Sequence, residues 1–233
     1  MDALLANIQA LLSAATLLFR KRYFSQSAHL SIVCGEECAK YILEFCKKNL
    51  PDEVIRRRFQ HLGKFRVLAV PWHVAGGLQV VYLLHALHEA GVFGEADADL
   101  VFDDLLDTIG QNNPQRLAET VMEYISRHQD GKVEAAQQRA AVEMEQYRRS
   151  SVYVDLDDDQ KVVGQPADIT RDVAKRYLIN ARVARTVVRF ISSNEPDIVE
   201  FTNALPREMR DEARRTAREM IQKVLAARDA NAS

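Results

Sequence analysis

The apolar residues near the start of the chain recur at steps of three and four, the spacing of one face of an α-helix. Basic residues at 20–22 follow this face and suit a helix C-terminus, where cations offset the helix dipole. A second helix is predicted over 25–48, before a Leu-Pro stop at 50–51. A third runs from there to about residue 70, where Pro71 interrupts it. The stripe of the first helix comprises Leu4, Leu5, Ile8, Leu11, Leu12, Ala15, Leu18 and Phe19.

The same periodicity continues through most of the chain. Gly76-Gly77 is predicted to precede a helix, and Gly131 to mark a turn. Residues 151–156 and 161–163 look like two short strands joined by an acidic turn. With 9 Gly and 6 Pro, the sequence predicts an all-α helical bundle with one small β-hairpin near 151–164. The later helices are predicted over 78–90, 98–109, 114–127, 132–149, 166–192, a short stretch from 195, and 207–228.

Composition bounds the class of protein. The 233 residues are 47% hydrophobic and 27% charged, which is ordinary globular composition and argues against disorder. Nothing in the chain looks like a linker, so we expect a single helical domain over 1–233, with 195–230 as a C-terminal helical extension. The formal net charge is −2, so any affinity for nucleic acid must be local.

The cysteines and the apolar segments indicate a cytoplasmic protein. Cys34, Cys38 and Cys46 fall in one predicted helix, and an odd count at helical spacing is no disulfide framework, so we expect a reducing compartment. The N-terminus lacks the basic start of a signal peptide. Glycines, Pro71 and polar residues break the apolar stretch 67–84, so we expect no membrane partner.

We expect neither a metal nor a cofactor. The acidic turn at 157–159 fails as an EF-hand loop, because the place of the final glutamate is taken by Pro166. His85 and His88 show no third ligand, and a metal-dependent hydrolase using Glu36, Glu37 and His61 is the weakest of the functions considered.

A charged cluster on the second predicted helix comprises Glu36, Glu37 and Lys40. At about 100° per residue, Lys40 can reach either carboxylate. The neighbouring residues are mostly apolar, so the cluster is expected to be partly buried and paired. Gly35 costs about 1 kcal/mol relative to Ala inside a helix, which close approach of another backbone or a ligand would explain. Structural pairing and a direct functional role both stay open.

A basic set comprises Arg57, His61 and Lys64, at i, i+4 and i+7 on one helix face. It offers two fixed cations and one group that titrates near neutral pH, as phosphate binding with proton transfer requires. The alternative is a solvated basic face.

A basic stripe lies opposite the apolar seam of the helix predicted over 166–192. It can bind RNA phosphates, or it is a face that is solvated or paired with acidic helices. Its members are Arg171, Lys175, Arg182, Arg185 and Arg189.

Several segments, in this order, resemble the abortive-infection protein V (AbiV) family. The likeness covers about residues 1 to 190. It is carried by Leu18-Phe19-Arg20-Lys21-Arg22-Tyr23, the helix 27–40 ending in Glu36-Glu37-Cys38-Ala39-Lys40, Phe59-Gln60-His61-Leu62-Gly63-Lys64, Arg149-Ser150-Ser151-Val152-Tyr153-Val154-Asp155, Pro166 and Ile169-Thr170.

The resemblance implies a helical domain of the HEPN group, many of whose members are dimeric, metal-independent ribonucleases with an R-x4–6-H motif. It implies a role in antiphage abortive infection that shuts down translation. Two strings fit the motif, Arg56 to His61 and Arg66 to His73. By helix geometry, however, Arg57 is the better partner for His61.

Two functions follow as hypotheses. In the first, the chain is a homodimeric effector acting on RNA or a ribosome-associated target, with His61, Arg57 and Lys64 as catalytic groups oriented by Glu36, Glu37 and Lys40. In the second, it is a non-catalytic interaction module that binds a phage protein or the translation apparatus. A phage protein is the expected activator.

Overall fold

The computed structural model describes much of the two ends of the chain and parts of the middle. The described residues are 1–46, 64–65, 67–68, 71–72, 75–76, 78–79, 131–152, 155–156, 161–193, 197–211, 213–215, 218–219 and 222. Most of them are helical, which confirms the helical fold class for this part of the chain.

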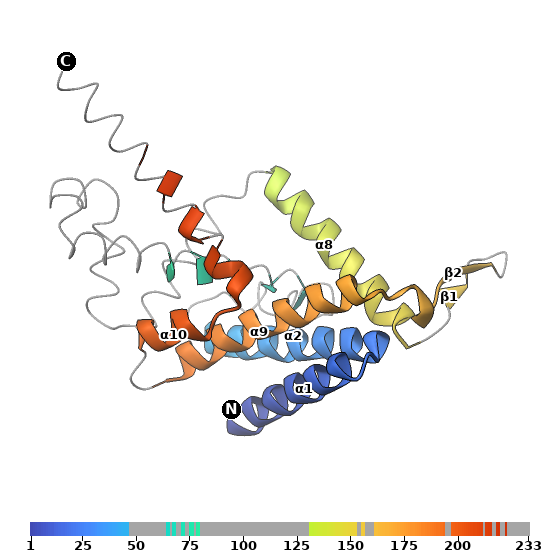
Figure 1. Cartoon of the computed structure of the whole chain (residues 1–233), viewed down its shortest axis with the longest axis horizontal. Helices are drawn as coiled ribbons and strands as arrows, with labels where there is room; N and C mark the ends of the chain where they lie inside the picture. The colour runs from blue at the N-terminus through green and yellow to red at the C-terminus, as the bar shows by residue number, and fades with distance from the viewer. Residues whose placement is uncertain are drawn as a thin grey trace, which may run out of the picture.

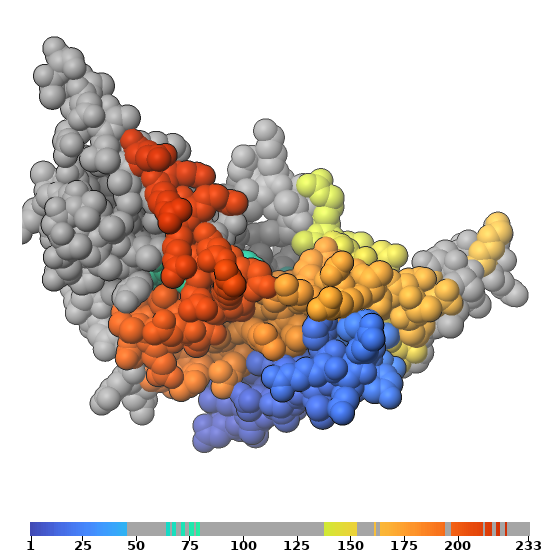
Figure 2. Space-filling view, viewed as in Figure 1, coloured from blue at the N-terminus to red at the C-terminus, as the bar shows by residue number. Residues whose placement is uncertain are grey.

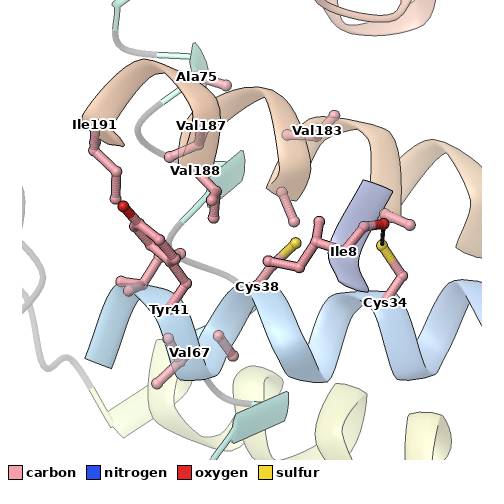
Figure 3. Packing of buried hydrophobic residues seen from close by; sticks show 14 of the residues in the cluster. Ile8, Cys34, Cys38, Tyr41, Val67, Ala75, Val183, Val187, Val188 and Ile191 are labelled. Carbon is pink, nitrogen blue, oxygen red and sulfur yellow. Dashed lines mark hydrogen bonds between the residues drawn. The ribbon is translucent and has the colours of Figure 1, made fainter. Parts of the chain in front are cut away.

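Three long helices lie side by side and form the centre of the structure (Figure 1). They are α1 (Asp2–Arg20), α2 (Phe24–Cys46) and α9 (Arg171–Ser192). Helix α2 packs against both others. The core between them includes Ile8, Cys38 and Val187, which Figure 3 shows meeting from the three helices.

Small residues let α1 and α2 approach closely. Ala15 and Ala28 are fully buried, and the Ser27 hydroxyl donates to the Ala15 carbonyl at 2.8 Å. The Cys34 thiol donates to the Ile8 carbonyl at 3.5 Å, as Figure 3 shows. These side chains cross the interface by bonding to the neighbouring helix backbone, so the helices pack with short side chains between them.

The turn between α1 and α2 is a Schellman motif. The Tyr23 amide donates to the Leu18 carbonyl at 2.9 Å, and the Arg22 amide to the Phe19 carbonyl at 3.0 Å. Arg22 occupies the left-handed position that usually holds glycine, with φ 66°. This turn sends α2 back along α1.

Helix α8 (Gly131–Ser150) leans away from the three central helices at one end and meets α2 near the other (Figure 1). A second core cluster joins it to the start of α2 and to α9, through Ala28, Met144 and Tyr177. Gly131 is the first residue of α8, so the prediction of a turn there is wrong.

The helix predicted over 166–192 is present as α9, which begins five residues later, at Arg171. A 3₁₀ turn, η2 (Pro166–Asp168), precedes it, and the Thr170 side chain accepts from the Val173 amide at 3.3 Å. The short helix α10 (Ile198–Ala204) follows, capped by Asp197. Figure 2 shows the surface of α9 as a band between the first two helices and the chain that follows residue 197.

Two short strands, β1 (Asp155–Leu156) and β2 (Val162–Gly164), pair antiparallel, with Asp155 opposite Gly164. They project from the end of the helices (Figure 1). The predicted hairpin included residues 151 and 152, which instead form a turn after α8.

Other predictions concern residues 64–79 and the middle of the chain. Leu68 is in a turn, and Pro71, Gly76 and Leu78 are helical. The helices predicted over 98–109 and 114–127, and most of those over 51–70 and 78–90, lie outside the described residues.

Helix α1 is the one described helix that is long and apolar enough to cross a membrane, and 11% of its most apolar 18-residue window is buried. Core helices of soluble proteins meet the same test. Here Ile8 and Ala15 pack against α2, while Leu17 is 57% exposed.

Candidate functional site

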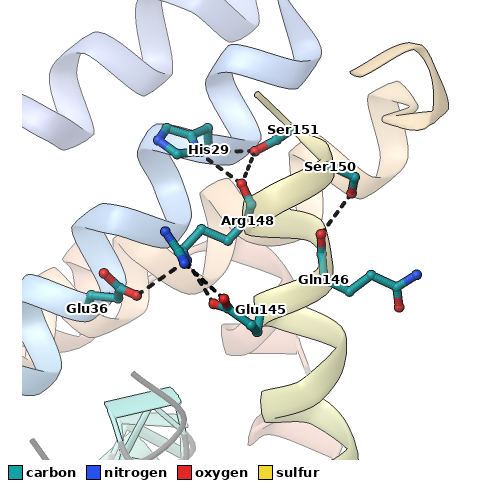
Figure 4. Close-up of polar contacts among 7 residues, drawn as sticks. All are labelled: His29, Glu36, Glu145, Gln146, Arg148, Ser150 and Ser151. Carbon is teal, nitrogen blue, oxygen red and sulfur yellow. Dashed lines mark hydrogen bonds and ion pairs between the residues drawn. The ribbon is translucent and has the colours of Figure 1, made fainter. Parts of the chain in front are cut away.

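The two adjacent glutamates of α2 have different partners. Glu36 is 8% exposed, and its Oε1 lies 3.9 Å from Nε of Arg148 on α8 (Figure 4). Oε2 of Glu37 lies 3.4 Å from Nδ2 of Asn7 on α1 and 4.0 Å from Nζ of Lys40. The predicted cluster therefore divides: Glu36 joins α2 to α8, whereas Glu37 and Lys40 lie toward α1. Lys40 is 44% exposed, so its pair contributes little stability.

Arg148 is the centre of the contact between α2 and α8. Its Nε and Nη2 donate to the two oxygens of Glu145 at 2.8 and 2.9 Å, one turn earlier on the same helix. This two-pronged geometry suits a planar guanidinium facing a carboxylate. Figure 4 shows the side chain between Glu145 and Glu36. One cation thus lies between two carboxylates.

His29 and two serines join α2 to the residues that follow α8. The Ser25 hydroxyl donates to the Ser151 carbonyl, and the Ser151 hydroxyl to the Arg148 carbonyl at 2.8 Å. Nδ1 of His29 lies 3.3 Å from the Arg148 carbonyl oxygen and 3.2 Å from Oγ of Ser151 (Figure 4). In the tautomer that donates from Nδ1, Nε2 is left as the acceptor. We call Ser25, His29, Glu36, Glu145, Arg148 and Ser151 the α2–α8 polar junction.

Sequence reasoning missed the central residue of this junction. The family segment Arg-x-x-x-Leu-Tyr-Val-Asp was matched from Arg149, which is exposed, whereas the neighbouring Arg148 contacts Glu36. A signal was present, because three residues separate Arg148 from Val152, which stands at the leucine position of that pattern. His29 was likewise judged one of the weaker histidines, although it lies about two turns before Glu36 on the same helix.

The predicted phosphate-binding set falls mostly outside the described residues. Lys64 is half-buried and helical, next to the buried Phe65. Arg57 and His61 lie outside, as do both arginines and both histidines of the strings fitting R-x4–6-H. That His61 and Lys64 converge in one cleft with Glu36, Glu37 and Lys40 stays a prediction.

Two of the five members of the basic stripe on α9 have acidic partners in the part of the chain that the structure describes. Lys175 pairs with Glu208 at 2.9 Å, and Arg189 with Glu200 at 2.5 Å. Arg171 and Arg182 are exposed, and Arg185 is half-buried. Ion pairing of two of the five members favours the structural alternative to RNA binding at those positions.

Gly35 lies against the side chain of Leu68. A Cβ at this position would come within 2.9 Å of a Leu68 methyl carbon. The close approach expected from the sequence is therefore made by a side chain, and not by backbone or a ligand. A leucine methyl can move aside, so an alanine here would be accommodated by a small shift.

Metal-binding and thiol chemistry find little support among the described residues. No group of three or more His, Cys, Asp and Glu is placed there to hold a metal ion. Cys34 and Cys38 are buried free thiols. Burial raises the pKa of the Cys38 thiol well above its ordinary value, and its hydrogen bond with Cys34 raises that pKa further. Such a thiol is a poor nucleophile.

Comparison with known proteins gives one match. The sequence model of the family described as "HEPN_AbiV: AbiV" matches residues 1–186. No curated protein and no solved structure matches the chain. The match includes α1, α2, α8 and most of α9, and therefore every residue of the α2–α8 polar junction.

Proposed function

The chain belongs to the AbiV family of HEPN-type abortive-infection proteins, and from this premise we propose that it is an antiphage effector acting on RNA or translation. The observation that carries the proposal is the family match over residues 1–186. The site of action is proposed to be cytoplasmic and the active form a homodimer, triggered by a phage protein.

The proposed chemistry is metal-independent cleavage of RNA. His61 removes the proton of a ribose 2′-hydroxyl, or protonates the leaving oxygen, while Arg57 and Lys64 stabilise the charged phosphate. The 2′-oxygen bonds to phosphorus as the bond to the 5′-oxygen breaks. The products are a 2′,3′-cyclic phosphate and a 5′-hydroxyl end.

The polar junction supports this chemistry by positioning, not by touching substrate. Glu36 is nearly buried and directed at Arg148, which Glu145 holds from the other side. Such a network keeps α2 and α8 in one arrangement. In the proposal, α2 then presents a fixed surface to the basic set.

The test uses purified protein, a His61→Ala variant and total cellular RNA, with and without lysate from phage-infected cells as the source of an activator. The expected result is new RNA ends carrying 5′-hydroxyls with the wild type and loss of at least a hundredfold in the variant, as removal of a general acid or base produces. Equal cleavage by both proteins contradicts the catalytic proposal. So does the absence of cleavage by the wild type both with and without the lysate.

A second function is favoured by the pairing of Glu36. Because this carboxylate is held by Arg148, the family's charged segment serves at least a structural purpose, as a non-catalytic module would require. In this alternative, the helices form a rigid surface that binds a phage protein or the translation apparatus.

Protection against phage separates the two functions. Cells expressing His61→Ala should lose protection if the protein is a ribonuclease and keep it if the protein is an interaction module. Plaque counts, with the amount of protein in each strain measured in parallel, decide between them. Capture of the same partner by both proteins would further support the module.

A further inference from the structure

A pocket of about 260 Å³ lies where four parts of the chain meet. Helices α2, α8 and α9 line it together with Phe65, Leu68 and Trp72, and most of its wall is apolar. Neither Lys64 nor any member of the basic stripe on α9 is among these lining residues. Pockets that bind small molecules are often found between the helices of a bundle, with apolar walls and a few polar groups.

Small residues from three helices line the pocket: Gly35 of α2, Ala140 of α8 and Ala181 of α9. The space directly beside Gly35 is taken by Leu68, which lines the pocket as well. Protein cores are normally packed without voids of this size, because the side chains around a void lose their contacts. A void of this size between the helices is therefore a reason to expect an occupant.

The wall carries three aromatic rings, Phe65, Trp72 and Tyr177. Nε1 of Trp72 donates to Oδ1 of Asn180 at 3.1 Å, which fixes the orientation of the amide and leaves its Nδ2 hydrogens for another acceptor. The Ser31 hydroxyl donates to the Ser27 carbonyl at 2.7 Å and can still accept a hydrogen bond. The pocket thus offers aromatic rings, a donor pair and an acceptor.

We propose that this pocket binds a nucleobase. Bases stack on aromatic side chains through their faces and form hydrogen bonds through their edges, and the pocket supplies groups for both. A lipid chain would leave the Asn180 donors unpaired in an apolar contact, which is costly. The exposed Arg176 beside Tyr177 is already paired with Glu143 at 2.7 Å. The groups that line the pocket therefore point to recognition of the ring.

The inference rests on the proposed RNA-directed function and adds a recognition site to it. The base is supplied either by single-stranded RNA or by a free nucleotide. Enzymes that act on single strands commonly hold one splayed base in a pocket.

The fluorescence of Trp72 provides a direct test, because the chain contains one tryptophan. The wild-type protein is titrated with AMP, GMP, CMP and UMP, and separately with short RNA oligonucleotides of each base. A stacked base should change the Trp72 emission saturably. A response to oligonucleotides alone identifies RNA as the source of the base, and a response to mononucleotides alone identifies a free nucleotide.

Two variants and a control locate the binding. Ala140→Leu adds bulk at an exposed position of the wall, and Asn180→Asp keeps an acceptor for Trp72 while removing the amide donors. Each should raise the dissociation constant about tenfold or more, which is the effect of losing one stacking contact or the hydrogen bonds to one edge of the base. Val142→Leu lies on the same helix, 49% exposed and away from the wall, and should bind as the wild type does.

Two outcomes overturn the inference. One is a folded wild type whose Trp72 emission does not change saturably with any nucleotide or oligonucleotide. The other is binding that Ala140→Leu and Asn180→Asp leave as strong as in Val142→Leu. If RNA cleavage or phage protection persists in either case, the pocket proposal fails and the proposed function stands.

Discussion

At the scale of single residues, position on the helix decides whether a charge is structural. Arg148 and Arg149 are neighbours with the same side chain, but about 100° of helix rotation separates them. Arg148 lies between two carboxylates, whereas Arg149 is exposed. The same holds for Glu36 and Glu37, of which one pairs with α8 and the other lies toward α1.

We predict that Arg148→Gln lowers the free energy of unfolding by about 1–3 kcal/mol, since it leaves Glu36 nearly buried beside Glu145 without the cation between them. Arg149→Gln should change it by less than about 0.5 kcal/mol. Urea denaturation measures both. Glu36→Gln combined with Arg148→Gln should cost less than the sum of the two single changes. Equal effects of the two arginine variants would contradict the assignment.

At the scale of elements, turns and caps decide how the helices follow one another. The Schellman turn after α1 places Arg22 at φ 66°, a conformation that costs a non-glycine residue about 1–2 kcal/mol. Small residues then let α2 lie close against α1. The α1–α2 pair is therefore held by backbone geometry and by close packing.

We predict that Arg22→Gly stabilises the protein by about 0.5–1 kcal/mol. Glycine removes the strain of the left-handed position, and its greater freedom in the unfolded chain offsets part of that gain. The melting temperature should rise by roughly 1–4 °C. Lys21→Gly, at φ −84°, is the matched control and should destabilise the protein. A lower melting temperature for Arg22→Gly would show that its side chain contributes more than the strain costs.

At the scale of the whole molecule, one continuous core couples α1, α2 and α9. Cys38 lies at its centre, where three helices converge (Figure 3). Burial raises the pKa of the Cys38 thiol, so the folded state keeps the proton at a pH where the unfolded chain releases it. Alkaline conditions therefore favour unfolding.

We predict that the free energy of unfolding falls as pH rises above about 8.5, the ordinary pKa of a cysteine thiol. One thiol that stays protonated in the folded state contributes a loss of about 1 kcal/mol between pH 8.5 and 9.5. Urea denaturation at several pH values measures it. Cys38→Ala should remove this part of the slope while leaving the trend below pH 8 unchanged. The same alkaline slope in both proteins would contradict the prediction.

Much of the fold was predictable because its signals are local. The apolar stripe of α1 and the apolar seam of α9 come from residues a few positions apart, and the structure confirms both helices, although α9 starts at Arg171 and not at 166. Gly131 was expected in a turn ahead of the helix predicted over 132–149, whereas α8 begins at Gly131 itself. Lengths and ends of helices follow from periodicity and caps.

The site was predictable only in part. The charged cluster was expected to be partly buried and paired, with Lys40 in reach of either glutamate, and Glu36 is 8% exposed with Arg148 at 3.9 Å. Its partner is Arg148, more than a hundred residues away in the sequence. The periodicity of a single helix does not indicate which distant residue will pack against it. The nucleobase pocket was not predictable at all, since its residues come from four segments whose proximity depends on packing.

The sequence by itself determined the helical class, the apolar stripe of α1, the end of α9 and membership of the AbiV family, because each depends on residue types at short or ordered spacing. Tertiary structure decided which of two neighbouring charges is buried and which small residues leave a pocket. Those outcomes depend on the rotation of one helix against another, and a single turn of helix offers every direction within four residues.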